Sequence, residues 1–211
     1  NPVPVPPFTG QRYVEHIDPA ELFPPANVQA LVRGRWGYRP GNMTAAEYDQ
    51  LIKEAVQPRY QELMERAVSE GWIQPKVTYG YFRCCSDGER LLVEADGKEF
   101  VFGFPRQAGA PFLCIADYFK KAEAGGDVAG FFVVTIGEKI AEETAKLYQA
   151  NAYHDYLLLH GFSVEVTDAL AEYWHAVMRQ ELGFAGQQIK NLYKAITQAY
   201  QGSRYGFGYP A

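Results

Sequence analysis

The feature that most restricts the fold is a series of three apolar runs, two of which are joined through an Asp-Gly pair. The runs extend from Lys76 to Cys84, from Glu89 to Glu94 and from Glu99 to Phe104, and they are rich in the Val, Tyr, Leu and Phe that strands favour. Asp96-Gly97, between the last two runs, readily takes the positive φ angles of a tight hairpin turn. The sequence therefore predicts an antiparallel sheet.

A helical pattern precedes these strands. From Thr44 to about Trp72 apolar residues recur three or four positions apart, which indicates an amphipathic helix. Thr44 and Glu47 have the spacing of a capping box, so the helix is expected to begin there. Pro58 lies within the pattern and has no amide proton to donate, so we expect a kink or a break near Gln57.

The remainder of the chain adds one strand and more helix. A fourth apolar run, Val128 to Ile136, follows a short helical stretch at Ile115 to Ala122 and is expected to rejoin the sheet. A helical region then runs from about Ile140 to Gly183, with a break expected near Gly161-Phe162, and a last amphipathic helix from about Ala185 to Tyr200. The order of elements predicts the α+β class, an antiparallel sheet flanked by helices.

Composition excludes two classes of partner. The 211 residues, 47% of them hydrophobic, suffice for one domain with a sizeable core. The formal charge of -5, with no cluster of Lys and Arg, argues against a nucleic-acid partner. No apolar run approaches the roughly 20 residues that span a bilayer, and no signal-like segment begins the chain, so a membrane is not an expected partner.

The cysteines indicate a reducing compartment. Cys84, Cys85 and Cys114 are odd in number, lack metal-site spacing, and include an adjacent pair that would bridge only with strain. We interpret them as reduced thiols and expect a cytoplasmic protein.

The two ends of the chain have loop chemistry. The proline-rich start from Asn1 to Pro7 is typical of a linker, so residues 1–15 are expected to be a linker or extension and residues 16–211 the domain. The end from Gly206 to Ala211 has no closing element, and we interpret the domain as truncated at its C-terminus.

The sequence contains none of the common catalytic motifs, and one polar helix face has two interpretations. Asp168, Glu172 and His175 recur at positions that share a face of a helix. A Glu-x-x-His segment can ligate iron, but such sites need a matching set from other helices, which His154-Asp155 supplies poorly. A solvated or hydrogen-bonded polar face is the favoured interpretation.

The C-terminal segment also has two interpretations. Gly206-Phe207-Gly208 would let backbone amides approach an anionic ligand, and Arg204 can present a planar fork to a carboxylate. Tyr205, Phe207 and Tyr209 offer aromatic faces to a planar or cationic ligand. A plain turn with surface packing is the alternative.

Several separated segments occur in the order and spacing of one known family. They are Leu22-Phe23-Pro24-Pro25-Ala26-Asn27, Arg33-Gly34-Arg35-Trp36-Gly37-Tyr38, Tyr79-Gly80-Tyr81-Phe82, Phe104-Pro105-Arg106-Gln107, Leu113-Cys114-Ile115-Ala116-Asp117-Tyr118, Ala171-Glu172-Tyr173-Trp174-His175, Tyr200-Gln201-Gly202-Ser203-Arg204 and Gly208-Tyr209-Pro210-Ala211. Together they resemble the activation domain of cobalamin-dependent methionine synthase. The resemblance implies a curved single domain whose twisted antiparallel sheet is flanked by helices.

The resemblance also implies a function. In that family S-adenosylmethionine binds a shallow groove that faces the cobalamin domain, and a reduced flavoprotein such as flavodoxin supplies an electron. Methylation coupled to this reduction returns inactive cob(II)alamin to methylcobalamin. The chain is accordingly expected to present the methyl donor as part of a methyltransferase, without independent catalysis, while a neighbouring domain binds cobalamin.

The family's motif places several ligand contacts near the C-terminus. Arg204 occupies the motif arginine and is expected to pair with the methionyl carboxylate of S-adenosylmethionine. Tyr209 and the backbone of Gly208, Pro210 and Ala211 are expected to line the same groove.

Three further positions concern the positive charge of the ligand. Asn27 stands where the family often has an acidic residue, and it can still hydrogen-bond an ammonium or ribose group. Asp168 and Gln198 stand at family glutamates, and of the three only Asp168 keeps a carboxylate. The resemblance gives Glu172 and His175 no ligand role.

Two other hypotheses stay open. The substitutions at Asn27 and Gln198 leave room for a non-catalytic domain that docks a corrinoid protein or flavodoxin. A free-standing metalloenzyme that uses Asp168, Glu172 and His175 is the third hypothesis, and it predicts stoichiometric metal.

Overall fold

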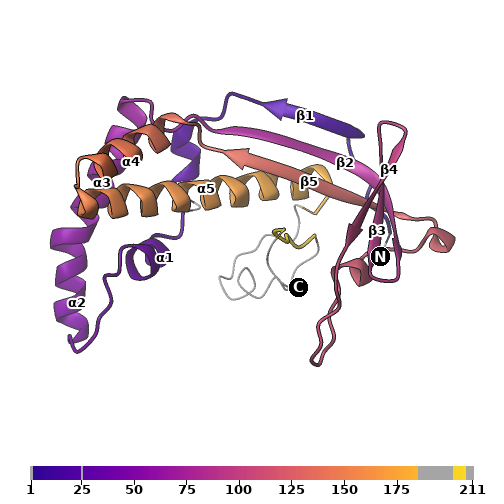
Figure 1. Ribbon diagram of the computed structural model, residues 1–211, viewed down its shortest axis with the longest axis horizontal. Helices are drawn as coiled ribbons and strands as arrows, with labels where there is room; N and C mark the ends of the chain where they lie inside the picture. The colour runs from indigo at the N-terminus through magenta and orange to yellow at the C-terminus, as the bar shows by residue number, and fades with distance from the viewer. Residues whose placement is uncertain (1, 25, 185–201, 208–211) are drawn as a thin grey trace. The chain divides into compact units, whose positions relative to one another are not determined.

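The computed structural model describes residues 2–24, 26–184 and 202–207 and confirms the α+β class (Figure 1). Its contacts divide the chain into two compact units, which are described separately. We call them the sheet unit, Asn1–Tyr13 with Thr78–Phe132 and His175–Ala211, and the helical unit, Val14–Val77 with Val133–Trp174.

One five-stranded antiparallel sheet contains all the strands of the described residues. The strands are β1 Gly10–Val14, β2 Lys76–Asp87, β3 Arg90–Ala95, β4 Lys98–Gly103 and β5 Asp127–Thr135. They are hydrogen-bonded in the order β1-β2-β3-β4, and β5 pairs with β2, as Figure 1 shows. The three predicted runs and the fourth strand that rejoins the sheet are therefore confirmed.

The hairpin between β3 and β4 forms as the sequence predicts. Asp96 and Gly97 have φ angles of 52° and 69°, which suits a tight turn between right-twisted strands. The turn sets a register in which Leu91 lies opposite Phe102. Leu91 belongs to a core cluster with Cys84, Val93 and Ala129, against which five phenylalanines pack, namely Phe82, Phe102, Phe104, Phe119 and Phe131.

Strand β1 lies within the stretch that was expected to be a linker or N-terminal extension. In that stretch, residues 1–15, Gly10–Val14 pair with β2. Phe8, just before β1, packs edge-on against the rings of Tyr79 and Tyr81, with centroids 5.4 and 5.2 Å apart. This aromatic contact draws the segment onto the sheet.

The predicted N-terminal helix forms in pieces. The pieces are α2 Ala45–Leu51, a π-helical turn Ile52–Val56 and α3 Gln57–Ser69. Thr44 and Glu47 form both hydrogen bonds of the capping box. The π-helical turn ends immediately before Gln57, and Pro58 lies in the first turn of α3, where a missing amide proton costs least. The kink or break predicted near Gln57 is therefore a change from π-helical to α-helical geometry, and the residues from Ala45 to Ser69 stay helical throughout.

The break predicted at Gly161-Phe162 is wrong. Helix α4 covers Lys139–Gln149 and α5 covers Tyr153–Glu181, so the chain breaks earlier, around Asn151, whose φ angle is 57°. Residue 161, inside α5, is a glycine because Trp36 packs against the helix there. A Cβ on Gly161 would lie 3.0 Å from Trp36 Cδ1. The glycine makes room for a ring and does not end the helix.

Short helical turns complete the description. Ahead of α2 lie a 3-10 turn Pro19–Leu22, helix α1 Val28–Ala30 and a π-helical turn Leu31–Arg35. The stretch predicted at Ile115 to Ala122 forms two 3-10 turns, Ile115–Tyr118 and Ala122–Ala124. The helix predicted for 185–200 lies outside the described residues. No helix among those described is long and apolar enough to cross a membrane.

Candidate functional site

The expected ligand contacts fall in both units of the chain. Asn27 and Asp168 belong to the helical unit, and Arg204 belongs to the sheet unit. The other expected contacts lie outside the described residues, and they are Gln198, Gly208, Tyr209, Pro210 and Ala211.

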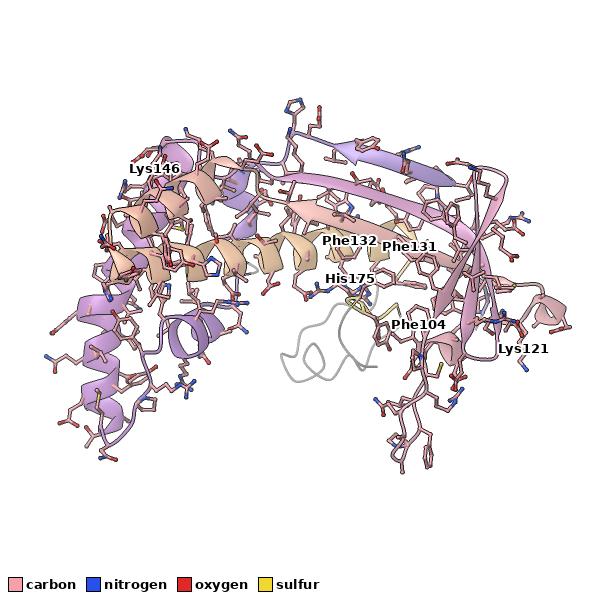
Figure 2. The ribbon with its side chains drawn as sticks, in the orientation of Figure 1. Phe104, Lys121, Phe131, Phe132, Lys146 and His175 are labelled. Atoms are coloured by element: carbon pink, nitrogen blue, oxygen red, sulfur yellow. The ribbon has the colours of Figure 1, made fainter. Side chains whose placement is uncertain are left out.

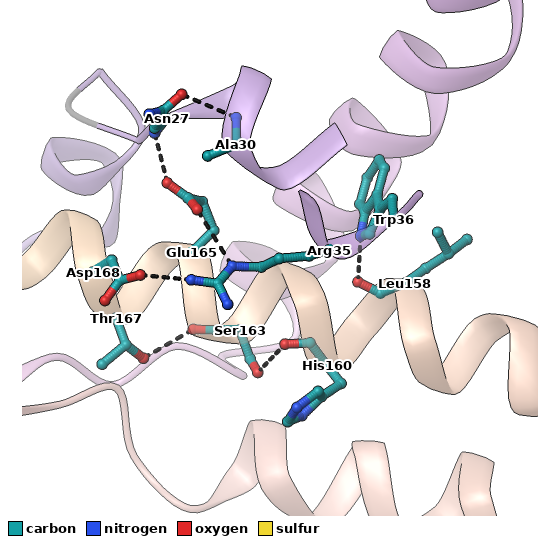
Figure 3. Close-up of polar contacts among 10 residues, drawn as sticks. All are labelled: Asn27, Ala30, Arg35, Trp36, Leu158, His160, Ser163, Glu165, Thr167 and Asp168. Atoms are coloured by element: carbon teal, nitrogen blue, oxygen red, sulfur yellow. Dashed lines mark hydrogen bonds and ion pairs between the residues drawn. The ribbon is translucent and has the colours of Figure 1, made fainter. Parts of the chain in front are cut away.

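Asn27 begins helix α1 and is held by two hydrogen bonds. Its side-chain Oδ1 accepts the Ala30 N–H at 3.0 Å, which makes it the N-cap. Its own N–H donates to Glu165 Oε1 at 2.7 Å, as Figure 3 shows. The amide oxygen, the side-chain atom of Asn27 that would accept a hydrogen bond from a ligand ammonium, is therefore engaged in capping.

Asp168 pairs with Arg35, and Arg35 also reaches a second carboxylate. Arg35 Nη2 donates to Asp168 Oδ2 at 2.7 Å, and Arg35 Nε lies 3.5 Å from Glu165 Oε2 (Figure 3). The two side chains differ in exposure, since that of Glu165 is 6% exposed and that of Asp168 is 57% exposed. The structure thus connects Asn27 and Asp168 through Glu165 and Arg35.

Sequence reasoning missed Glu165 and gave Arg35 no role. Glu165 and Asp168 are three residues apart in α5, so they project from one face of the helix. That spacing was a signal for Glu165, although no motif marks it. Arg35 carried a weaker signal, because its pairing with α5 depends on a contact distant in sequence.

Trp36 fixes the position of Arg35. The Trp36 indole donates from Nε1 to the Leu158 carbonyl at 2.9 Å, and its ring packs edge-on against Tyr60 at 6.5 Å. Tyr60 in turn contacts Phe162 at 5.9 Å. Burial raises the pKa of Tyr60, and the negative charge of Glu165 raises it further. Glu165 therefore lies close enough to this aromatic cluster to act on the Tyr60 hydroxyl.

Aromatic stacking holds the segment that contains Arg204. The Tyr205 ring stacks on Tyr118 with centroids 5.8 Å apart. Phe207 lies almost parallel to Phe131, at 6.3 Å and 9°, and stacks on Phe104 at 6.5 Å. Figure 2 labels Phe131, which lies on β5, and Phe104, which follows β4 directly. The surface-packing interpretation therefore holds for Tyr205 and Phe207.

His175 contacts the same segment. Its Nε2 lies 2.7 Å from the Gly202 carbonyl oxygen, which fits an N–H donor on that nitrogen. The described residues contain no group of three His, Cys, Asp or Glu placed to hold a metal ion. Asp168 is hydrogen-bonded to Arg35. Two of the three residues of the predicted polar face, Asp168 and His175, therefore make the contacts that the hydrogen-bonded interpretation of that face requires.

Comparisons with known proteins identify relatives of the whole chain. The family model described as "Vitamin B12 dependent methionine synthase, activation domain" matches residues 42–211. Methionine synthase of Mycobacterium tuberculosis is 36% identical over 229 residues, and that of Mycobacterium leprae is 34% identical over 230. Each alignment covers 99% of this chain and 19% of the relative, so the chain spans about a fifth of the length of these relatives.

A solved structure shares the fold. The crystal structure of the MetH reactivation domain bound to AdoHcy superposes with a TM-score of 0.78 at 20% sequence identity. The match covers 99% of this chain and 67% of that chain.

Proposed function

This chain belongs to the activation-domain family of vitamin B12 dependent methionine synthase, and on that premise we propose that it binds S-adenosylmethionine and presents its methyl group for reductive methylation of cob(II)alamin. The observation that carries the proposal is the family match over 42–211, a range that includes Asp168 and Arg204. The ligand named for the structural neighbour, AdoHcy, supports it, because AdoHcy is what S-adenosylmethionine becomes when its methyl group leaves.

Arg204 is the proposed partner of the methionyl carboxylate. A guanidinium fork fits a carboxylate with two parallel charge-assisted hydrogen bonds. The stacked rings of Tyr205 and Phe207 hold the backbone on the C-terminal side of Arg204, so less freedom is lost when a ligand binds. Further contacts are proposed from Tyr209 and from the backbone of Gly208, Pro210 and Ala211.

Asp168 is the proposed acidic contact for the positive charge of the ligand. Its side chain is 57% exposed, so the carboxylate is accessible although Arg35 pairs with one of its oxygens. Asn27 and Gln198 are proposed as polar contacts. With its Oδ1 engaged at Ala30, Asn27 has its side-chain NH₂ left for ligand oxygens.

The proposed partners are a cobalamin-binding domain of the same enzyme and a reduced flavoprotein such as flavodoxin, in the cytoplasm. One electron and the methyl cation of S-adenosylmethionine together convert cob(II)alamin to methylcobalamin, and the sulfur keeps the bonding electron pair. This chain supplies the methyl donor and its orientation. The free thiols of Cys84, Cys85 and Cys114 suit a reducing compartment.

Transfer of a labelled methyl group tests the proposal. The full chain is combined with a cobalamin-binding domain in the cob(II)alamin form, a one-electron reductant and methyl-labelled S-adenosylmethionine. We expect label in methylcobalamin only when the chain is present, and a large loss of rate with Arg204→Ala. Co-purification of the two proteins without any labelled product would instead favour the docking domain.

A further inference from the structure

Arg35 bridges two carboxylates that differ in depth. One nitrogen of its guanidinium lies 2.7 Å from the exposed Asp168, and another lies 3.5 Å from the buried Glu165 (Figure 3). We propose that Arg35 is a specificity-determining residue, which weakens the preference of the site for the positively charged sulfonium ligand over the neutral thioether. The inference rests on the proposed function, in which Asp168 meets the positive charge of the ligand, and it takes that charge to be the sulfonium.

Glu165 explains why an arginine is held at this place. A buried carboxylate is costly unless hydrogen bonds and an opposite charge accompany it. Glu165 receives one hydrogen bond from the Asn27 N–H at 2.7 Å and its opposite charge from Arg35. Arg35 therefore has a reason to occupy this position that is independent of Asp168.

The position of Arg35 lowers the electrostatic attraction between Asp168 and an approaching cation. Coulomb energy falls as the inverse of distance, so a guanidinium in direct contact with the carboxylate offsets a large part of its attraction for an approaching cation, about half when the guanidinium lies twice as far from the cation as the carboxylate does. The negative charge of Glu165 is buried and farther from any group that approaches Asp168 from solvent. The three charges sum to minus one, yet Arg35 weakens the attraction that a cation meets at the exposed side of Asp168.

The two ligands isolate this effect. S-adenosylmethionine and its thioether product carry the same adenine, ribose, ammonium and carboxylate groups, and they differ by one methyl group and the charge on sulfur. The ratio of their dissociation constants therefore reports the sulfonium charge. A variant that merely loosens the fold weakens both ligands and leaves the ratio unchanged.

A charge-neutral double substitution is the sharpest test. Arg35→Gln with Glu165→Gln removes one positive and one negative charge, keeps an acceptor for the Asn27 N–H, and leaves Asp168 as an unpaired carboxylate. We expect the dissociation constant of the thioether, divided by that of S-adenosylmethionine, to rise about fivefold. The gain should shrink in high salt and disappear when Asp168→Asn is added.

A matched control exists on the same helix. Arg59 also bridges two carboxylates, Glu62 and Asp155, and Asp155 lies in α5. Arg59→Gln with Asp155→Asn is likewise charge-neutral and should leave the ratio of the two dissociation constants unchanged.

The outcomes separate the inference from the proposed function. A double variant that binds both ligands with the wild-type ratio, or with both affinities reduced alike, would overturn the role of Arg35 while leaving the proposed function intact. A folded wild-type chain that binds neither ligand would overturn the proposed function, and the role of Arg35 with it.

Discussion

The indole of Trp36 lies against Gly161 so closely that no larger residue fits without movement. A Cβ on Gly161 would lie 3.0 Å from Trp36 Cδ1 and 3.1 Å from Arg35 Cβ. The ring has little freedom to retreat, because Trp36 Nε1 is hydrogen-bonded to Leu158 at 2.9 Å. This contact places Arg35 beside the carboxylates of α5.

Gly161→Ala should therefore destabilise the protein. Alanine gains about 1 kcal/mol of helix propensity over glycine, but overpacking a fixed neighbour costs about 1–3 kcal/mol. We expect a net loss of about 1 kcal/mol in the free energy of unfolding, measured by chemical denaturation. Gly34→Ala is the control, because a Cβ there meets nothing within 4 Å, and it should be neutral or stabilising. Equal stability of the two variants would contradict the packing argument.

Local signals explain which elements the sequence could predict. The apolar runs of β2 to β4, the Asp96-Gly97 turn and the Thr44–Glu47 capping box each depend on residues a few positions apart, and all of them form. The meaning of Gly161 depends on Trp36, far away along the chain. A glycine that breaks a helix and one that admits a ring look the same in sequence.

In the candidate site, too, the sequence predicted the residues that a motif marks and missed those that depend on contacts between distant segments. Asp168 and Asn27 were named from a family motif, and they lie in one connected network. Glu165 and Arg35, which connect them, were missed because an ion pair between distant segments leaves no local pattern. Arg204 was named from the motif, and its ligand role is still a prediction.

The carboxyl group of Asp117 makes the stability of the folded state depend on pH in the acidic range. Arg106 donates two hydrogen bonds to Asp117, at 2.5 and 2.8 Å, and these bonds hold the pKa of that carboxyl below its ordinary value. The pair therefore stabilises the folded state above the ordinary pKa of about 4, and this contribution is lost as the pH falls through the lowered pKa.

The measurement is the unfolding midpoint of wild type and Asp117→Asn from pH 7 to pH 2. Wild type should be the more stable at neutral pH, and the difference should close as the carboxyl protonates. Arg106→Gln should reproduce the same pattern. A difference in midpoint that stays constant across this pH range would contradict a contribution from the ionised Asp117 carboxyl.

Cys84 should resist alkylation. It is buried, and burial, with the negative charge of Asp127 adding, raises its pKa to about 12. Because the thiolate is the reactive form, iodoacetamide at pH 8 should leave Cys84 unmodified and label the less buried Cys85 first. Tandem mass spectrometry distinguishes the two positions, and denaturant should make all cysteines reactive. Equal labelling of Cys84 and Cys85 in the folded protein would be the contrary result.

Tyr81→Phe should destabilise the sheet unit. The fully buried Tyr81 hydroxyl donates to Glu181 Oε2 at 2.7 Å, and burial raises the pKa of Tyr81 so that the hydroxyl stays protonated. Loss of this hydrogen bond should cost about 1–2 kcal/mol in the free energy of unfolding. Tyr13→Phe, at a position 69% exposed, should change it by less than about 0.5 kcal/mol. Equal unfolding free energies of the two variants would contradict a stabilising role for the Tyr81–Glu181 hydrogen bond.

The most direct test of the account is calorimetric titration of the full chain with S-adenosylmethionine, for wild type and Arg204→Ala. We predict saturable binding to wild type and a loss of about tenfold to a hundredfold in affinity for the variant, since a charge-assisted hydrogen-bond pair contributes about 1.5–3 kcal/mol. Arg204→Lys should lie between the two, because lysine keeps the charge and loses the fork. A folded wild-type chain without binding, or equal affinity of wild type and Arg204→Ala, would contradict the claim that this domain holds the methyl donor.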